Sequence, residues 1–365
     1  MLFRSTNTLA RGSPRIAKVQ NYNAAGDVAS LAYSDGTPGV VNTYDRRGRL
    51  ATVVHNGITT TQVYHDAGAL LAESYSGGFL AGLAVTNVLD ARLRRATNGL
   101  TLNNSFLAWT TNTYDNASRL TAVGNDTFTA SYAYLANSPL WGTLTFKQNG
   151  TTRMTTTRQF DRLNRLQQVT ALPSEPAPGA ISYAYVHDDA NQRTRATLAD
   201  GSYWIYAYDR LGQVISGKKY WSDGTPVAGQ QFEYAFDDIG NRTSTKAGGD
   251  QTGANLRTAT YTATTLNQYT NRTVPGAADV LGITHPGATV SVNADTNVYR
   301  RGEYFRKELS INNVSAAQYP PVSVVAGYQG TNTTDAGYLF VPQTPEGFAH
   351  DLDGNLIGDG RWTNV

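Results

Sequence analysis

The sequence predicts an all-β protein made of antiparallel hairpins, and three observations support this prediction. Charged residues make up only 16% of the 365 residues, while the chain contains 22 tyrosines and is rich in threonine. Sparse charge with abundant threonine and tyrosine favours strands over surface helices. A short turn motif recurs along the chain, and Asn-Gly and Asp-Gly pairs lie between its copies. The apolar fraction of 40% is enough for a buried core and excludes wholesale disorder.

The recurring motif combines an aromatic residue, an aspartate, a glycine and an arginine. Its clearest copies are YDRRGRL at 44–50 and YDRLGQV at 208–214. Copies begin at positions 44, 64, 89 and 114, and the copy at Leu89-Asp90 fits only loosely. Such short spacing corresponds to one hairpin and not to one domain. The motif residues are Tyr44, Asp45, Gly48, Arg49, Tyr64, Gly68, Tyr114, Asp115, Arg119, Phe160, Asp161, Asn164, Arg165, Tyr208, Asp209, Gly212, Phe236, Asp237, Gly240, Arg242, Asp351 and Gly354.

A second, tighter turn is expected in each hairpin. Asn-Gly and Asp-Gly pairs supply the positive φ angles that tight hairpin turns need. One unit is therefore expected to contain a strand over 49–54, a turn at Asn56-Gly57, a strand over 58–64 and a wider turn through Gly68. The pairs assigned to these turns are Asp35-Gly36, Asn56-Gly57, Asn98-Gly99, Asn149-Gly150, Asp200-Gly201 and Asp223-Gly224.

Each motif residue has a predicted structural role. The tyrosine ring packs on the next hairpin while its hydroxyl reaches water or backbone. The aspartate opens the turn and accepts backbone N–H groups. The glycine adopts the left-handed conformation, for which Asn164 and Asn191 are the usual substitutes. The arginine starts the next strand and is expected to reach a carboxylate on a neighbouring turn.

The motif, its recurrence and its hairpin spacing resemble the RHS/YD-repeat family, which includes bacterial RHS-repeat proteins, toxin-complex shells and teneurins. The segments NSPLWGT at 137–143 and FKQNG at 146–150 also resemble bacterial members. The resemblance covers most of residues 20–250 and resumes near residue 345. It implies a continuous spiralling sheet that closes into a hollow shell. It also implies export or a place at the cell surface, and in bacteria an enclosed C-terminal toxin.

The chain departs from complete bacterial toxins of this family in one respect. Those proteins end the shell with an Asp-Pro-containing core motif, and this sequence has no Asp-Pro dipeptide. The sequence start also lacks the apolar region of a secretory signal peptide. We therefore expect a fragment of a shell, whose partners are an enclosed C-terminal effector or the remaining repeats of the intact protein.

Five segments are expected along the chain. Residues 1–20 belong to a truncated repeat, and residues 21–245 form the repeat sheet. Residues 246–275 are a linker or irregular strands, and the sequence leaves both alternatives open. Residues 276–345 contain short apolar runs separated by Gly, Asn and Pro, and they predict an inserted β-sandwich-like module. Residues 346–365 are a final partial repeat.

The sequence offers few residues for reaction chemistry. The five histidines are not spaced as metal ligands, and there is no cysteine. The usual metalloprotease, serine-hydrolase and phosphate-loop motifs are missing from the sequence. Asp351-x-Asp353-x-Asn355 resembles the start of a calcium loop but lacks its glycine and glutamate positions. We expect no catalytic residue, cofactor or metal, and we interpret this stretch as a solvated turn.

Nucleic-acid and membrane-spanning roles are not expected. The net charge of +2 is too small for a general attraction to phosphate. The most apolar stretch, residues 79–85, is too short to cross a bilayer.

The leading hypothesis is a non-enzymatic segment of a structural β-shell that encapsulates or displays a partner polypeptide. The alternative is a carbohydrate-binding cell-surface adhesin, in which Tyr206, Tyr208 and Tyr234 stack on sugar rings. The aromatic residues of successive repeats would also form a stripe if they only packed hairpin on hairpin. The two interpretations differ in whether the rings are exposed.

Overall fold

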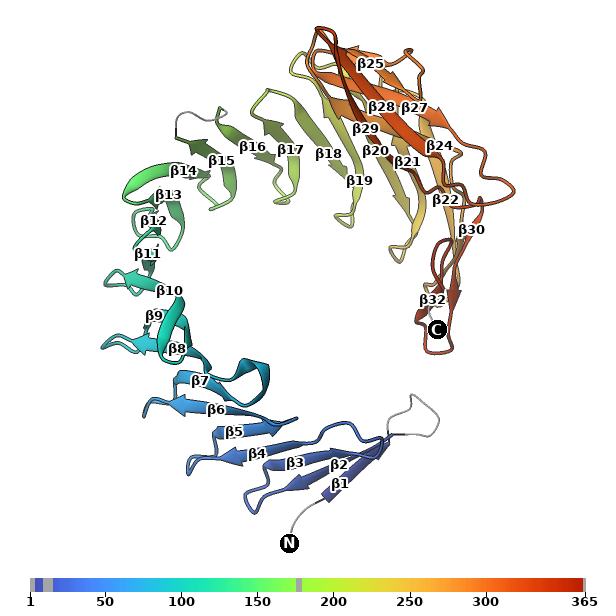
Figure 1. Ribbon diagram of the computed structural model, residues 1–365. Helices are drawn as coiled ribbons and strands as arrows, with labels where there is room; N and C mark the ends of the chain where they lie inside the picture. The colour runs from blue at the N-terminus through green and yellow to red at the C-terminus, as the bar shows by residue number, and fades with distance from the viewer. Residues whose placement is uncertain (1–3, 9–15, 175–178, 364–365) are drawn as a thin grey trace. The chain divides into compact units, whose positions relative to one another are not determined.

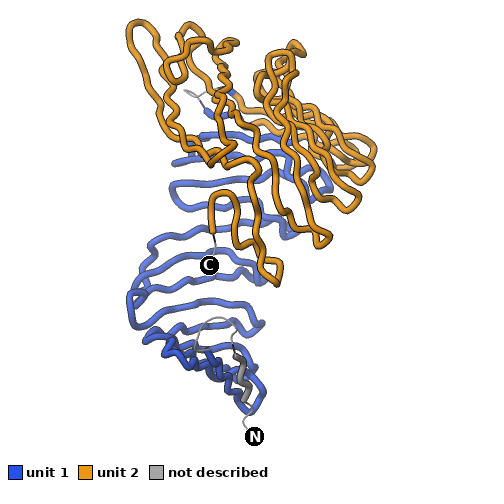
Figure 2. Tube along the Cα trace, turned by 90° about the vertical axis from the view of Figure 1, so that its right-hand side faces the viewer, with its two compact units in different colours: residues 1–158, 171–179 blue, residues 159–170, 180–365 orange. Residues whose placement is uncertain are grey.

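The computed structural model describes residues 4–8, 16–174 and 179–363, and it divides into two compact units (Figure 2). Unit 1 contains residues 1–158 and 171–179, and unit 2 contains residues 159–170 and 180–365. Within the expected segments 1–20, 21–245 and 346–365, residues 1–3, 9–15, 175–178 and 364–365 lie outside the described residues. The predicted all-β fold class is confirmed, because no α-helix is found in the described part of the chain.

The strands of unit 1 follow one another as hairpins (Figure 1). Each is antiparallel to the next, from β1 through β14. The elements are β1 (Arg4–Thr8), β2 (Ala17–Tyr22), β3 (Val28–Tyr33), β4 (Val40–Tyr44), β5 (Leu50–His55), β6 (Ile58–Tyr64), β7 (Leu70–Ser76), the 3-10 turn η1 (Gly78–Leu80), β8 (Leu83–Leu89), β9 (Arg95–Leu102), β10 (Ser105–Tyr114), β11 (Leu120–Gly124), β12 (Phe128–Tyr134) and β13 (Trp141–Gln148). β14 (Thr151–Phe160) and β15 (Leu166–Pro173) contain residues of both units.

Unit 2 continues the same pattern from β16 to β23, again with each strand antiparallel to the next. Its ladder strands are β16 (Ile181–His187), β17 (Arg193–Leu198), β18 (Tyr203–Tyr208), β19 (Val214–Tyr220), β20 (Pro226–Phe236), β21 (Arg242–Gly248), β22 (Leu256–Ala263) and β23 (Tyr269–Arg272). Residues 246–275, for which a linker and strands were both open, thus contain β22 and β23.

The chain leaves this ladder after β23 and returns to it at β30 (Glu346–Gly347), which pairs with β23. The intervening residues form two three-stranded sheets, here called sheet C and sheet D, so the inserted module is sandwich-like. Sheet C has the order β24 (Ala277–Ile283), β27 (Tyr304–Ser310), β26 (Tyr299–Arg301). Sheet D has the order β25 (Thr289–Val292), β28 (Pro321–Tyr328), β29 (Thr331–Tyr338). A last hairpin joins β31 (Ala349–His350) and β32 (Leu356–Gly358).

The tight hairpin turns form mainly where the sequence predicts them. Asn56 and Gly57 join β5 to β6 with φ angles of 48° and 74°, and Asn149-Gly150 does the same between β13 and β14. The prediction at Asn98-Gly99 is wrong, because both residues lie inside β9. Gly99 is needed there for packing, since a Cβ on it would lie 2.5 Å from the Phe106 ring.

The turn next to this pair lies a few residues further along the chain. Asn103 and Asn104 supply the positive φ angles of 49° and 67° between β9 and β10. Asparagine tolerates the left-handed conformation, so two consecutive asparagines replace Asn-Gly in this hairpin.

Burial differs between the two units. The buried apolar side chains among the described residues all lie in unit 2, chiefly in β20 and in the inserted module, including Val227, Ala228, Val292 and Phe305. Strands of unit 1 leave large apolar side chains in contact with solvent, such as Val41 and Val63 with 52% and 48% exposure. The hairpins of unit 1 therefore form a single layer that must be held together by contacts within the layer.

Sheet C is fixed to the ladder strands of unit 2 by polar contacts. Asp223 pairs with Arg301 at 2.6 Å, and the Tyr304 hydroxyl donates to the Ala228 carbonyl at 2.6 Å. Arg257 of β22 pairs with Asp279 of β24. The module thus covers one face of β20 to β22 (Figure 1). None of the described residues belongs to a helix with the length and apolar character required to cross a membrane.

Candidate functional site: the repeat turns

Each predicted motif forms a five-residue turn, here called a repeat turn, that runs from the motif aspartate, or from the residue in its place, to the residue four positions later. In the first clear copy, Asp45 Oδ1 accepts the backbone N–H groups of Arg47 and Arg49 at 2.8 and 3.0 Å. The Asp45 N–H donates to the Arg49 carbonyl, and Gly48 closes the turn with a φ of 76°. The pairing of β4 with β5 shifts register at Tyr44, as expected where a left-handed residue forms a bulge.

The same arrangement recurs with different residues at the glycine position. The carboxylates that accept turn N–H groups belong to Asp90, Asp115, Asp161, Asp188, Asp209, Asp237 and Asp351. The left-handed residues are Gly48, Gly68, Leu93, Ser118, Asn164, Asn191, Gly212, Gly240 and Gly354. Leu89-Asp90, which fits the motif only loosely in sequence, forms a complete repeat turn with Leu93 at φ 61°.

Three turns with this arrangement were missed by sequence reasoning, and one of them runs from Asp250 to Ala254 with Gly253 at φ 79°. Another follows Tyr134 and has Asn137 at φ 53°, and the third begins at Thr264 and has Asn267 at φ 61°. The Thr264 hydroxyl accepts the turn N–H groups that a carboxylate accepts elsewhere. Asn267, like Asn164 and Asn191, lies four positions after the end of a strand, whereas Asn137 lies three positions after Tyr134 in a turn that is one residue longer.

The motif arginine does not reach a neighbouring carboxylate, and that prediction is wrong. Arg49 Nε donates to Oδ2 of Asp45 in its own turn at 2.7 Å, and Nη1 donates to the His65 carbonyl of the next turn at 3.0 Å. The side chain begins one residue after the left-handed glycine, which brings the guanidinium back beside the carboxylate that opens the turn. Its remaining N–H groups point forward, where a backbone carbonyl accepts.

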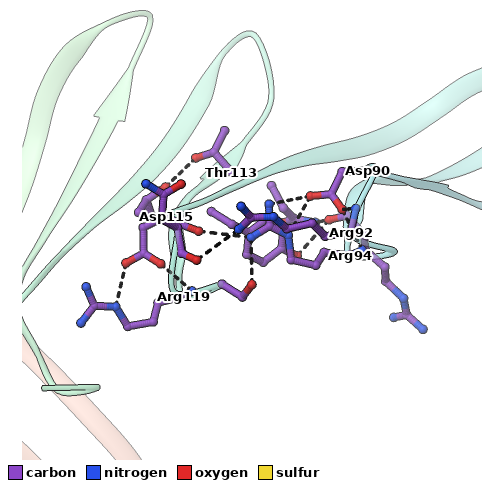
Figure 3. A network of polar contacts seen from close by, with 12 residues as sticks. Asp90, Arg92, Arg94, Thr113, Asp115 and Arg119 are labelled. Carbon is purple, nitrogen blue, oxygen red and sulfur yellow. Dashed lines mark hydrogen bonds and ion pairs between the residues drawn. The ribbon is translucent and has the colours of Figure 1, made fainter.

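Three further arginines make both contacts. Figure 3 shows Arg94 bound to Asp90 and reaching forward to the next turn, and Arg119 bound to Asp115. Arg94 Nη1 donates to the Asp115 carbonyl at 3.2 Å, and Arg119 Nη1 donates to the Ser138 carbonyl at 2.5 Å. Arg165 binds Asp161 at 2.6 Å and the Asp188 carbonyl at 2.8 Å.

The predicted motif arginine Arg242 plays a different part. Asn241, one residue earlier, occupies the arginine position and donates through Nδ2 to Asp237 Oδ2 at 3.0 Å. The same Nδ2 group lies 3.2 Å from Asn267 Oδ1 in the next turn. The Arg242 backbone N–H donates to the Tyr269 hydroxyl at 2.8 Å. Asn241 thus makes the same two kinds of contact as the motif arginine, one within its own turn and one to the next turn, through a shorter side chain.

Tyrosines complete the link between successive turns. The guanidinium carbons of Arg49, Arg94 and Arg119 each lie 4.5 Å from the ring centre of the next tyrosine, namely Tyr64, Tyr114 and Tyr134. Each of these tyrosines donates its hydroxyl back to the carbonyl of the residue that follows the arginine, at 3.0, 2.9 and 2.8 Å. We call this combination of arginine and tyrosine contacts a turn bridge.

Tyrosines in other copies keep only part of a turn bridge. The hydroxyls of Tyr44 and Tyr208 donate to the carbonyls of Val28 and Arg193 at 2.9 and 2.8 Å. Phe160 and Phe236 end β14 and β20 as half-buried rings without a hydroxyl. Phe160 and Phe236 thus keep the ring of the motif tyrosine without its hydroxyl.

The electrostatics of the turns follow from their hydrogen bonds. The backbone N–H and the side chain of Arg49 hold the pKa of the Asp45 carboxyl below its usual range. The Arg94 side chain and backbone N–H do the same for Asp90, and the Arg119 backbone N–H and side chain for Asp115. The carboxylates of Asp45, Asp90 and Asp115 are therefore stabilised in their charged form, which suits a structural acceptor.

The residues proposed for sugar stacking take part in packing. Tyr206 stacks on Trp204 at 6.3 Å between ring centres, and burial raises the pKa of its hydroxyl. Tyr208 donates its hydroxyl to backbone, and the Arg242 guanidinium lies 5.4 Å from the Tyr234 ring centre. These contacts favour cross-strand packing as the reason for the aromatic stripe.

Residues 4–8, 16–174 and 179–363 contain no group of three or more histidine, aspartate or glutamate side chains placed to hold a metal ion. Asp351 accepts the N–H groups of Asp353 and Asn355 and the side-chain amide of Asn355, as the other turn carboxylates do.

Comparison with known proteins gives a structural likeness without a sequence relative. No family model matches the sequence, and no curated protein is similar to it. Among solved structures, a crystal structure of TcdB2-TccC3-Cdc42 matches with a TM-score of 0.51 at 12% identity over 98% of this chain. The Tc holotoxin pore of Photorhabdus luminescens matches with a TM-score of 0.51 at 13% identity over 97% of this chain. A crystal structure of TcdB2-TccC3-TEV gives a TM-score of 0.50 at 13% identity over 96% of this chain.

These matches concern the fold. The chain spans 22%, 21% and 19% of the lengths of the three chains that it matches. The chain therefore has the β-shell fold of the Tc toxin chains.

Proposed function

We propose that the chain is a non-enzymatic segment of a structural β-shell that encloses a partner polypeptide. The observation that carries the proposal is the turn bridge. It joins neighbouring hairpins along the turn edge of a single layer that has few buried side chains in unit 1. A layer built in this way is a wall, because its strength comes from hairpin-to-hairpin contacts and both of its faces remain available.

The fold likeness supports the enclosing role. The titles of the matching structures describe Tc toxin assemblies, and this chain shares their fold over 96–98% of its length. Bacterial shells of the resembling RHS/YD-repeat family enclose a toxin, and we extend this role to the present chain. The same wall gives no support to a sugar-binding role, since the repeat tyrosines are engaged by arginine or by backbone.

Protease protection tests the proposal. The protein is expressed from its natural gene and digested with trypsin, and the rate at which each peptide appears is measured by mass spectrometry. If the shell encloses a partner polypeptide, the exposed turn at Arg46-Arg47 should be cut early. The enclosed polypeptide should stay uncut until the wall opens. Weakening two turn bridges, with Arg94→Ala and Arg119→Ala together, should expose that polypeptide.

A matched control is available in the same fold. Arg162 lies in a repeat turn with an exposed side chain, so Arg162→Ala should leave protection unchanged. If every part of the natural gene product is cut at the rate expected from its local exposure, with no protected stretch, the enclosing role is contradicted.

A further inference from the structure

The inserted module ends in a strand that is open on one side. β29 pairs with β28 along its full length and is the edge strand of sheet D. All eight of its residues are exposed. Natural proteins usually protect a long edge strand with proline, lysine or a bulge, because its free backbone groups can pair with another chain. The β29 sequence TNTTDAGY contains none of these protective features.

The register shows which backbone groups are free. The Leu339 N–H donates to the Pro320 carbonyl in the same antiparallel ladder, which places Thr331, Thr333, Asp335 and Gly337 in the hydrogen-bonded pairs with β28. The backbone groups of the alternate residues, Asn332, Thr334, Ala336 and Tyr338, therefore point away from β28. Among the described residues no strand pairs with that side.

A groove lies beside this edge. It has a volume of about 830 Å³ and is lined by residues of both sheet C and sheet D. Val280 and Phe305 line it from sheet C, and Val322, Val324 and Ala326 line it from sheet D. β24 is the edge strand of sheet C and also borders the groove, so the sandwich is open between two strand edges.

One charge on this edge has no counterpart. Asp335 is paired in register with Val324 and lines the groove. Across the described part of the chain no ion pair or hydrogen bond of its carboxylate is found, whereas Asp295 pairs with Lys307 at 2.5 Å and Asp279 with Arg306 at 2.7 Å. A basic side chain beside Asp335 would complete the groove, while a second copy of this chain would bring another carboxylate to the same edge.

We propose that the open side of the module binds an extended segment of a partner polypeptide, which adds to β29 as a fourth strand of sheet D. Alternate side chains of that segment enter the groove, where apolar residues contact Val322, Val324 and Phe305 and one lysine or arginine pairs with Asp335. Main-chain hydrogen bonds supply affinity in this mode of recognition, and the alternating side chains supply specificity. The inference does not depend on the enclosing role proposed above.

A synthetic peptide tests the inference on the full chain. The probe is an eight-residue peptide that alternates threonine with valine and has one lysine in place of a central valine. Binding is measured by fluorescence anisotropy. Thr334→Pro removes an N–H that points away from β28 and leaves the bonds between β28 and β29 in place, and proline is tolerated on an edge strand. Thr334→Ala keeps that N–H and is the matched control.

We expect saturable binding to the natural chain and to Thr334→Ala, with affinity at least about tenfold lower for Thr334→Pro. Asp335→Asn should weaken binding about threefold and make it less sensitive to salt. Circular dichroism and thermal unfolding of each variant show whether it is folded.

Three results would overturn the inference. One is a lack of saturable binding up to about 1 mM peptide. Another is equal affinity for a folded Thr334→Pro and for the natural chain. The third is a dimer, seen by sedimentation, that Thr334→Pro dissolves, because the occupant would then be a second copy of the chain.

Discussion

The guanidinium of Arg94 lies over the ring of Tyr114, and the Tyr114 hydroxyl donates to the carbonyl of Arg95 at 2.9 Å. The arginine reaches forward to the next repeat turn while the tyrosine reaches back. Two contacts in opposite directions fix both the distance and the angle between neighbouring hairpins. A single-layer sheet can therefore hold its shape without a hydrophobic core on either face.

Removing a bridging arginine should weaken the wall. Arg165→Ala deletes the bonds to Asp161 and to the Asp188 carbonyl. We expect the unfolding midpoint to fall by about 2 to 4 °C, because charge-assisted hydrogen bonds are lost. Scanning calorimetry measures this. Arg162→Ala, in the same turn, should leave the midpoint unchanged, and an equal effect of both variants would contradict the bridging role.

Removing only a tyrosine hydroxyl should have a smaller effect. Tyr44→Phe deletes the bond to the Val28 carbonyl at 2.9 Å and keeps the ring. We expect a loss of about 1 kcal/mol in the free energy of unfolding, measured with urea. Tyr319→Phe is the control, because this side chain is 62% exposed. A neutral Tyr44→Phe would mean that the ring contact alone joins these two hairpins.

The glycine of the repeat turn should be replaceable by asparagine but not by alanine. Gly48 has a φ of 76° and open space around its missing Cβ, so any cost of substitution comes from the backbone conformation. Gly48→Ala should destabilise the protein by about 1 kcal/mol. Gly48→Asn should be closer to neutral, since Asn164 and Asn191 occupy this position at φ 62° and 64°. Urea unfolding compares the two, and equal losses would be evidence against the conformational argument.

Acid should loosen the module from the ladder. The Thr225 N–H and hydroxyl and the Arg301 guanidinium lower the pKa of Asp223 from 3.8 to about 2. A carboxyl whose pKa is lower in the folded state stabilises the fold above its unfolded pKa, and this contribution disappears as the pH falls from about 3.8 to about 2. Urea midpoints should therefore fall over this interval.

The variant Asp223→Asn isolates this contribution. It should be less stable than the natural chain at neutral pH, and the gap between them should narrow toward about pH 2. A gap that is constant across this interval would contradict the assignment. The neighbouring Trp221, whose ring centre lies 5.6 Å from that of Tyr304, offers a fluorescence probe of the same contact.

The sequence predicts much of the fold because the hairpin information is local. A carboxylate, a left-handed residue and an aromatic ring within six positions determine a turn, so repeat turns such as 45–49 and 209–213 are visible without coordinates. Prediction from the motif fails where residues of other types adopt the same backbone conformation or accept the same hydrogen bonds. Leu93, Ser118 and Asn137 adopt the glycine conformation, and Thr264 replaces the carboxylate.

Contacts between residues of different hairpins could not be predicted from the sequence. The arginine position in the motif predicts an ion pair but does not identify the partner. The register shift at Tyr44 brings the Arg49 guanidinium back to Asp45 of its own turn, and Arg49 also donates to the His65 carbonyl of the next turn. Likewise Asn98-Gly99 has the composition of a turn and lies in a strand because the Phe106 ring, seven residues later, needs the space beside Gly99. The open edge of β29 depends on which strands of the module become neighbours.

The most direct measurement is a cryo-electron microscopy map of the protein expressed from its natural gene. The account predicts that the repeat turns beginning at Asp45, Asp90, Asp115 and Asp161 follow one another along one edge of a continuous wall, with polypeptide density against one face of that wall. A map in which these turns belong to separate compact bodies, or in which the wall borders only solvent, would contradict it.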